Sequence, residues 1–400
     1  MSPPLRIPIN PSVLTWAREW FNMSTGYVAS KMGATSITQK TIEDWENGEK
    51  QPTYRQLQKL AHIVDKPVEI FLYPSVPDIP KPSALYRAVY GEYINDIPTE
   101  VLQAISYAKK YQNNLRELTH GRNPSNNLII RNRFTGNIPQ TARDVRKILG
   151  IDLSMQKEIR SHSKAFEQWR SALADAGVYV FKKPFDNMDY SGFCLEDPEF
   201  PIICVNNTMA LQRQIFTLFH ELYHLLSGHN GVDFTDDKQV LPNLTKDMQR
   251  LERACDSFAA EFLVPTDDFQ YEISQIPSHH EVLLHGSYSD VMDDCVNPLS
   301  KKYSVSLDVI LRKLLDAGCI DSSRYSQLYR NHRPDISRDP GNNGGGNYYS
   351  NQVSYLGRSY IHLVMETQEM YGFPDYVTAE YLGESVKNLP QLVKSARGSL

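Results

Sequence analysis

The run His-Glu-Leu-Tyr-His at residues 220–224 constrains this chain most, because it names both a local structure and a chemistry. Two histidines four apart share one helix face, with Cβ atoms about 5–6 Å apart, so both imidazoles can bind one metal ion. Glu221 follows about 100° round the helix, beside the ion rather than on it. There it can accept a proton from a water held by the metal. The run therefore predicts metal-assisted hydrolysis.

The residues around this run are apolar on nearly every side of the predicted helix. They are Leu218, Phe219, Leu222, Leu225 and Leu226. A helix of this kind is expected to be buried. Buried His and Glu side chains must be satisfied, or folding loses several kcal/mol. One metal ion satisfies them together; the alternative is a buried helix whose two histidines find ordinary partners.

A third ligand is expected from a nearby helix, because hydrolytic zinc sites use three protein ligands and keep a fourth position for water. Residues 247–263 have helical apolar spacing, and Pro265 follows. Glu252 can bind the metal, and Asp256, one turn later, can accept the free N–H of a ligand histidine. The alternative is a plain amphipathic helix with a solvated acidic face, which the small residues Ala254, Ala259 and Ala260 weaken.

The pair of segments resembles the ImmA/IrrE family of zinc metallopeptidases, whose second segment reads E-x-x-A-[ND]-x-F-A-x-x-[LF]-L-x-P. The matching positions are Glu252, Asp256, Phe258, Ala259, Phe262, Leu263 and Pro265. Cys255 departs from the pattern, since the family usually has alanine there. The resemblance covers residues 178–265. It implies zinc as cofactor, His220, His224 and Glu252 as its ligands, and Glu221 as general base.

Three short strands are predicted before the active-site helix, at residues 178–181, 192–195 and 201–205, separated by turn residues. Zinc peptidases often bind an extended peptide as an added strand at such a sheet edge. A polypeptide substrate is consistent with this arrangement.

The amino-terminal residues 11–73 form a different pattern, with helical runs predicted at 13–21, 27–32, 38–45, 54–63 and 68–72. The segment 41–53 resembles the hallmark of the Xre/Cro helix-turn-helix family, I-x-x-W-E-x-G-x-x-x-P-T. Trp45 is expected in the core, Gly48 at a helix end, and Pro52 at the start of the next helix.

Such a domain places the first residues of its recognition helix in the major groove of DNA. Here these residues are Thr38, Gln39, Lys40 and Thr41. Gln39 suits a base edge, whereas Lys40 and the hydroxyls suit phosphates. Residues 1–75 carry eight Lys/Arg and seven Asp/Glu, so the domain lacks the basic excess of most DNA binders. Protein contact or dimerisation therefore stays open as its use.

Composition indicates an ordinary globular protein: 400 residues, 41% hydrophobic, with a net charge of −5. We expect a cytoplasmic protein with no membrane contact, because no signal peptide opens the chain and no apolar run approaches the length of a membrane span. The five cysteines form no C-x-x-C pair, which favours free thiols in a reducing compartment.

The predicted fold class is mainly α with a small β-sheet (α+β). We expect a five-helix, Xre-type helix-turn-helix domain at residues 1–75, a helical linker region at 76–160 and a zincin-like metallopeptidase domain at 161–290. A helical, helix-turn-helix-like segment follows at 291–333, then a flexible linker at 334–350 and a helical C-terminal tail at 351–400. For residues 296–315, a hairpin that closes the core is as good an interpretation as a DNA contact.

The leading hypothesis is a regulatory zinc-dependent endopeptidase, fused to a DNA-binding domain, that cleaves a repressor or another regulator. The second hypothesis is a transcription regulator or an antitoxin that binds a toxin, with a structural or sensory zinc site. A third is a peptidase whose helix-turn-helix only recruits the substrate. Whether the chain forms a homodimer stays open.

Overall fold

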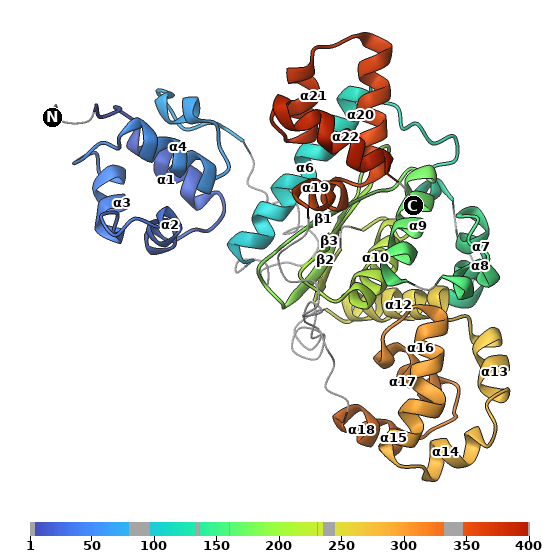
Figure 1. Ribbon diagram of the computed structural model, residues 1–400. Coiled ribbons are helices and arrows are strands. Elements are labelled where there is room, and N and C mark those ends of the chain that lie inside the picture. The colour runs from blue at the N-terminus through green and yellow to red at the C-terminus, as the bar shows by residue number, and fades with distance from the viewer. Residues whose placement is uncertain are drawn as a thin grey trace. The chain divides into compact units, whose positions relative to one another are not determined.

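The computed structural model describes residues 5–79, 97–132, 134, 137–159, 161–229, 231–234, 245–331 and 347–398. Contacts divide the chain into two compact units, Met1–Tyr107 and Ala108–Leu400. The chain is mainly helical with one small sheet, which confirms the predicted fold class (Figure 1). Among the described residues, no helix has both the length and the apolar character needed to cross a membrane.

The first unit contains the five predicted helical segments. They are α1 (Pro11–Glu19), α2 (Thr25–Met32), α3 (Gln39–Glu46), α4 (Tyr54–Ile63) and the 3-10 helix η1 (Val68–Leu72). Trp45 is buried, as expected, and Gly48 has φ +76° just after α3. The expectation for Pro52 was wrong by two residues: Thr53 caps α4, and its capping box with Gln56 starts the helix at Tyr54.

Helix α6 (Thr99–Leu118) begins in the first unit and is anchored there by polar contacts. The Thr99 hydroxyl donates to the carbonyl of Phe21 at 2.8 Å. The amide of Gln103 donates to the carbonyl of Ile63 at 3.0 Å. Helix α6 falls within the region 76–160 that was expected to be helical, and its start packs on the helix-turn-helix core.

The second unit is built on a four-stranded sheet of order β1-β3-β2-β4. The strands are β1 (Tyr179–Lys183), β2 (Tyr190–Leu195), β3 (Ile202–Asn206) and β4 (Val232–Phe234). β1 pairs with β3 in parallel, and the other two pairings are antiparallel. The three predicted strands are confirmed. β4 was not predicted, because three residues are too few for a pattern of period two.

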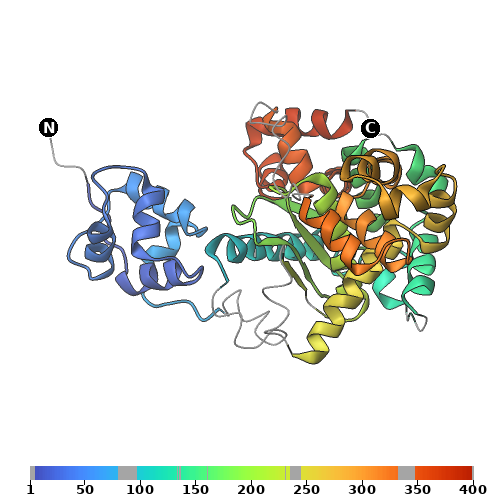
Figure 2. The same cartoon turned by 90° about the horizontal axis from the view of Figure 1, so that it is seen from below.

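The helix α10 (Leu211–Leu226) packs on β2 and β3 and against α12 (Lys246–Leu263), and these elements are labelled in Figure 1. Figure 2 shows α12, in yellow, from a second side. Phe219 of α10 stacks on Phe262 of α12 with ring centroids 4.0 Å apart. Trp169 of α9 (His162–Asp175) meets Phe219 edge-on at 5.6 Å. Aromatic contacts at these distances add to the burial energy of each ring. This packing fixes the spacing between the two helices that carry the predicted ligands.

Two short helices, α7 (Ile138–Ile148) and α8 (Leu153–Glu158), support the end of α12. Buried Arg146 donates to the carbonyl of Phe262 at 2.7 Å, and buried Gln156 donates to that of Leu263 at 2.9 Å. Because the last carbonyls of a helix lack partners within it, these two donors satisfy the end of α12.

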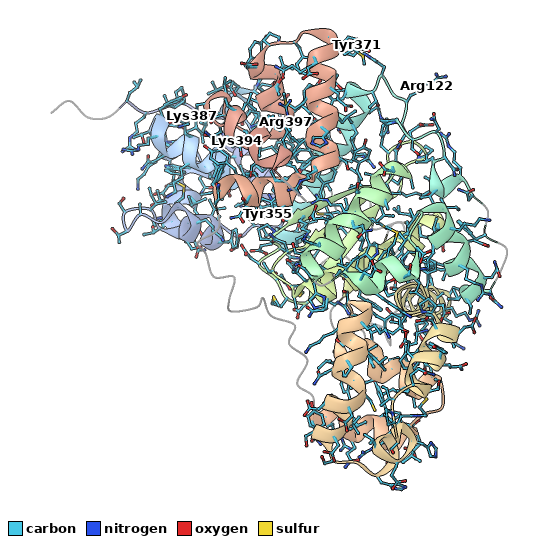
Figure 3. All side chains as sticks on the ribbon, turned by 45° about the vertical axis from the view of Figure 1, so that its right-hand side comes forward. Arg122, Tyr355, Tyr371, Lys387, Lys394 and Arg397 are labelled. Carbon is cyan, nitrogen blue, oxygen red and sulfur yellow. The ribbon has the colours of Figure 1, made fainter. Side chains whose placement is uncertain are left out.

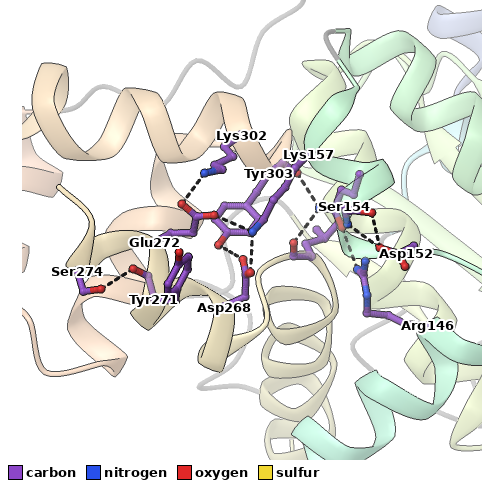
Figure 4. Close-up of polar contacts among 12 residues, drawn as sticks. Arg146, Asp152, Ser154, Lys157, Asp268, Tyr271, Glu272, Ser274, Lys302 and Tyr303 are labelled. Carbon is purple, nitrogen blue, oxygen red and sulfur yellow. Dashed lines mark hydrogen bonds and ion pairs between the residues drawn. The ribbon is translucent and has the colours of Figure 1, made fainter.

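The helices after α12 continue the same apolar core. They are α13 (Thr266–Ser274), α14 (His279–His285), α15 (Tyr288–Val291), η5 (Met292–Val296), α16 (Asn297–Tyr303), α17 (Leu307–Asp316) and α18 (Ser322–Asn331). Figure 4 shows a polar network in which Lys157 of α8 contacts Asp268 at 2.6 Å and Glu272 at 2.8 Å, both on α13. The predicted helix–turn–helix at 296–315 is present as α16 and α17, and α17 buries Ile310, Leu311 and Leu314 in the core.

The chain ends in a second helical group that lies against β1 and α9. It comprises α19 (Tyr348–Leu356), α20 (Arg358–Tyr371), α21 (Asp375–Leu382), η7 (Val386–Asn388) and α22 (Leu389–Arg397). Figure 3 shows Tyr355 on this group, with Lys387, Lys394 and Arg397 on its last turns. The predicted linker at 334–350 lies outside the described residues as far as residue 346.

Arg170 of α9 joins this group to the sheet. Its guanidinium donates to the carbonyls of Val180, Ser354 and Tyr355 at 2.7, 2.7 and 3.0 Å. Gly357, with φ +82°, lies so close that an added Cβ would come within 2.6 Å of the Arg170 guanidinium carbon. One buried cation therefore holds three carbonyls from two segments far apart in the sequence.

We expect Arg170→Met to destabilise the second unit by about 2–4 kcal/mol, because the buried carbonyls lose their donor. Urea unfolding measures this loss, and amide hydrogen exchange is expected to rise in α19 first. The exposed Arg122 provides the control substitution, Arg122→Met. Equal stability of the two variants would contradict the role given to Arg170.

Candidate metal centre

The histidines and glutamate of the 220–224 run lie buried on α10. His220 is 1% exposed, and Glu221 and His224 are fully buried. The apolar residues around them are buried too, which confirms the expected position of this helix. The helix ends where Gly228 takes φ +71°. Three polar side chains thus sit within an apolar core, where each needs a partner.

Glu252 of α12 meets both histidines, as the sequence predicted. Its Oε2 lies 3.2 Å from Nε2 of His220 and 3.5 Å from Nε2 of His224. The two Nε2 atoms are 3.2 Å apart. Three donor atoms from two helices therefore converge on one point.

Asp256 lies one turn after Glu252, at hydrogen-bond distance from the other nitrogen of His220. Its Oδ1 is 3.0 Å from Nδ1, and the carboxylate is 39% exposed. A carboxylate accepts, so we assign a proton to Nδ1; Nε2, which faces Glu252 and His224, is then the atom that would bind a metal in place of its own proton. This is the contact expected of Asp256.

The convergence of these atoms requires a cation among them, either protons on the imidazoles or a divalent ion. With metal–ligand bonds of 2.0–2.1 Å, a tetrahedral site has ligand atoms about 3.3–3.5 Å apart. The observed separations of 3.2, 3.2 and 3.5 Å match that spacing. The donor set, two imidazoles and a carboxylate, is one that zinc accepts in hydrolytic sites. The residues present therefore fit a zinc ion.

The charges of the cluster also favour a cation. Burial alone would raise the pKa of Glu252, but hydrogen bonds from His220 and His224 outweigh it and hold the pKa well below its usual range. Burial would lower the pKa of His224, but Cys255 and Glu252 outweigh it and raise the pKa to about 10. The centre is a site of negative potential, which attracts protons and metal ions alike.

Glu221 is fully buried beside the converging donors, next to Cys194 of β2 and Gly231. Cys194 of β2 is its neighbour: burial and the Glu221 charge raise the pKa of that thiol well above its ordinary value. The thiol accepts the Gly231 N–H at 3.0 Å, and the Cys194 N–H donates to the Gly231 carbonyl at 3.0 Å. Water is thus excluded from one side of the carboxylate.

Sequence reasoning missed Gly231. A Cβ added there would come within 2.5 Å of the His224 ring and 2.6 Å of the Glu221 carboxylate. The backbone at Gly231 therefore covers the two polar side chains as closely as a residue without a side chain allows. The only sequence signal is a glycine soon after the helix, which is too common to single out.

In the sequence, Cys255 stood out only as a departure from the family pattern, but in the structure it lies at the centre. Ligand atoms of His220, His224 and Cys255 all lie within 4.8 Å of one another. The thiol is fully buried, which raises its pKa. The structure thus offers a fourth donor besides the predicted three.

The residues predicted to contact DNA lie at the start of α3. Thr38 is the N-cap, and its side chain and that of Thr41 form a capping box. Gln39 donates to Glu43 at 2.8 Å, and Lys40 lies 3.5 Å from Asp44 with 80% of its side chain exposed. The two hydroxyls are therefore used within the helix start, while Gln39 and Lys40 are exposed.

Residues 173–315 match the family model described as IrrE N-terminal-like domain, a peptidase family of the M78 group. Residues 14–71 match the model described as Helix-turn-helix. Comparison with curated proteins and with solved structures gave no significant match. The first match covers α10 and α12 with all the converging donors, and the second covers the whole of α2, α3 and α4.

We expect Gly231→Ala to weaken metal binding by about tenfold or more, because the methyl must displace a ligand ring or its neighbour. The zinc dissociation constant, measured by competition with a chromogenic chelator, tests this. Gly26→Ala is the control, since a Cβ there meets nothing closer than 3.4 Å. If both variants bind zinc as the unchanged protein does, Gly231 does not shape the site.

Proposed function

Since the chain joins an N-terminal Xre-type helix-turn-helix domain to an IrrE/ImmA-like metallopeptidase domain, we propose that it is a regulatory zinc peptidase. It hydrolyses peptide bonds in a protein partner such as a repressor. His220, His224 and Glu252 hold the zinc, Glu221 is the general base, and Asp256 orients His220.

The observation that carries this proposal is the donor triangle, with its edges of 3.2–3.5 Å and a separate carboxylate beside it. Zinc bound there would supply Lewis-acid polarisation of a water and of a peptide carbonyl. A purely structural site has no use for a buried carboxylate outside the ligand set. Glu221, fully buried and next to His220, is such a group.

The chain's own residues supply the proton transfers and the orientation. Glu221 takes a proton from the attacking water and returns it to the leaving amine, a role that suits a buried carboxylate beside the metal ligands. Asp256 keeps the proton of His220 on Nδ1, so that Nε2 stays a donor to the metal. The backbone at Gly231 limits the access of bulk water to Glu221.

The helix-turn-helix domain would direct this activity to a regulatory setting. Gln39 and Lys40, exposed at the start of α3, suit a base edge and a phosphate respectively. The DNA sequence and the identity of the partner follow from neither residue. A toxin bound by an antitoxin-like chain is the other partner class we consider.

The alternative function is a transcription regulator or antitoxin whose zinc site is structural or sensory. One observation favours it: Cys255 gives the centre a fourth protein donor, and closed four-ligand sites are typical of structural zinc. A peptidase that uses its helix-turn-helix only to recruit the substrate would show no sequence-specific DNA binding.

His220→Ala and Glu221→Gln separate these functions. His220→Ala is expected to lose the bound zinc, because one of three converging donors is gone. Glu221→Gln is expected to keep about one zinc and to slow cleavage by roughly 10²–10⁴-fold, because the amide cannot accept the proton. Zinc is measured by elemental analysis, and cleavage by comparing new protein N-termini in cells producing each variant.

Two outcomes would decide against the peptidase. If His220→Ala retains its zinc, the metal is not bound at the proposed site. A regulatory effect that survives intact in Glu221→Gln would favour the binding function instead. Lys394→Ala, an exposed substitution on α22, is the control for expression and folding.

To test DNA recognition, the unchanged protein is first used to select its preferred DNA sequence from a random pool. The binding of each variant to that sequence is then measured. Gln39→Ala is expected to cost about 1–3 kcal/mol and to relax the preference at one base pair. Lys40→Ala is expected to weaken binding on every sequence and to lower the salt slope by about 1. Lys394→Ala again serves as control. If the unchanged protein enriches no sequence from the random pool, sequence-specific binding is excluded.

A further inference from the structure

We propose that Cys255 binds the metal of this centre through its sulfur, in addition to His220, His224 and Glu252, so that a fourth protein ligand closes the resting site. The proposal rests on the proposed zinc site and adds a state to it. The thiolate would take the position that a water needs, and hydrolysis would require it to move aside.

The placement of Cys255 on α12 brings it to the donor cluster. It lies three residues after Glu252, so both face α10 from adjacent turns of one helix. Its Sγ is within 4.8 Å of ligand atoms of both histidines. Nitrogen and sulfur ligands of one tetrahedral zinc lie about 3.5 Å apart, from bonds of 2.0–2.1 and 2.3 Å.

The environment gives this thiol no other evident use. Cys255 is fully buried, and on the same pair of helices the rings of Tyr223 and Phe258 lie with centroids 5.0 Å apart, tilted by 35°. Nδ1 of the fully buried His224 makes no hydrogen bond within the described residues, whereas Nδ1 of His220 has Asp256. Nδ1 of His224 thus lacks a carboxylate such as the one that meets His220, while Glu252 and the sulfur of Cys255, both on α12, lie near the ring of His224.

Binding replaces one bond by another without any oxidant or reductant. The S–H bond of Cys255 breaks heterolytically, its proton leaves to solvent, and the sulfur lone pair forms the bond to the metal. A coordinating thiol is deprotonated outright by such a cation. A thiolate in the set also favours zinc, cobalt and cadmium over magnesium or manganese, because it is a soft ligand.

Cobalt(II) substitution tests the bond directly, without any measurement of activity. The full-length protein loaded with Co²⁺ is expected to show ligand-field bands in the visible and a sulfur-to-cobalt charge-transfer band in the near ultraviolet. Cys255→Ala is expected to keep the ligand-field bands, lose the charge-transfer band and bind Co²⁺ at least about tenfold more weakly. Cys255→Ser serves as a second variant of closer size.

Cys194→Ala is the matched control, since Cys194 is the other buried thiol at the centre and lies beside Glu221. Its charge-transfer band is expected to remain. A protein with ligand-field bands but no charge-transfer band, or a band that survives in Cys255→Ala and Cys255→Ser, would overturn this proposal and leave the zinc site standing. The unchanged protein could also lack the charge-transfer band while Cys255→Ala still binds Co²⁺ more weakly. Cys255 would then only position His224, and the proposed bond from sulfur to metal would be overturned. Failure to bind Co²⁺ and Zn²⁺ at all would remove the proposed function, and this inference with it.

Discussion

The packing of α10 on α12 is the contact on which the rest of the second unit depends. Phe219 and Phe262 stack at 4.0 Å, and small residues such as Ala259 are fully buried between the helices. At that separation a carboxylate from α12 reaches two imidazoles from α10. If the two helices lay further apart by the width of one methyl group, Glu252 would no longer reach the histidines, because a close-packed core transmits such changes.

The same packing makes the centre electrostatically demanding. Glu252 and both histidines are at least 95% buried, so none can rely on solvent. Their mutual contacts compensate part of the desolvation cost, and a bound cation would compensate more of it. Gly231 and Cys194 close the other side, where Glu221 lies. The site therefore joins stability to chemistry, because the buried groups whose desolvation opposes folding are those that a metal would satisfy.

Support for α12 comes from segments that the sequence alone left without a role. Arg146 and Gln156 satisfy the last carbonyls of that helix, and Gln156 also donates to the carbonyl of Tyr303. Residues 138–158 read as helical in the sequence, but nothing in their pattern indicated two buried polar side chains. Such contacts join residues more than 100 positions apart, and helical periodicity carries no information about partners at that range.

The sequence by itself determined the local structures and the placement of the two histidines on one face of α10. Apolar spacing and capping residues placed the helices, and four-residue spacing placed His220 and His224 on one face, because both follow from local geometry. Glu252 and Asp256 needed the second helix as well, and their motif located them. Only the tertiary structure brought Gly231, Cys194 and Cys255 to the centre. Their roles depend on close approach between separate segments, which is decided by how β2, β4 and α12 pack around α10 rather than by any residue's neighbours in the chain.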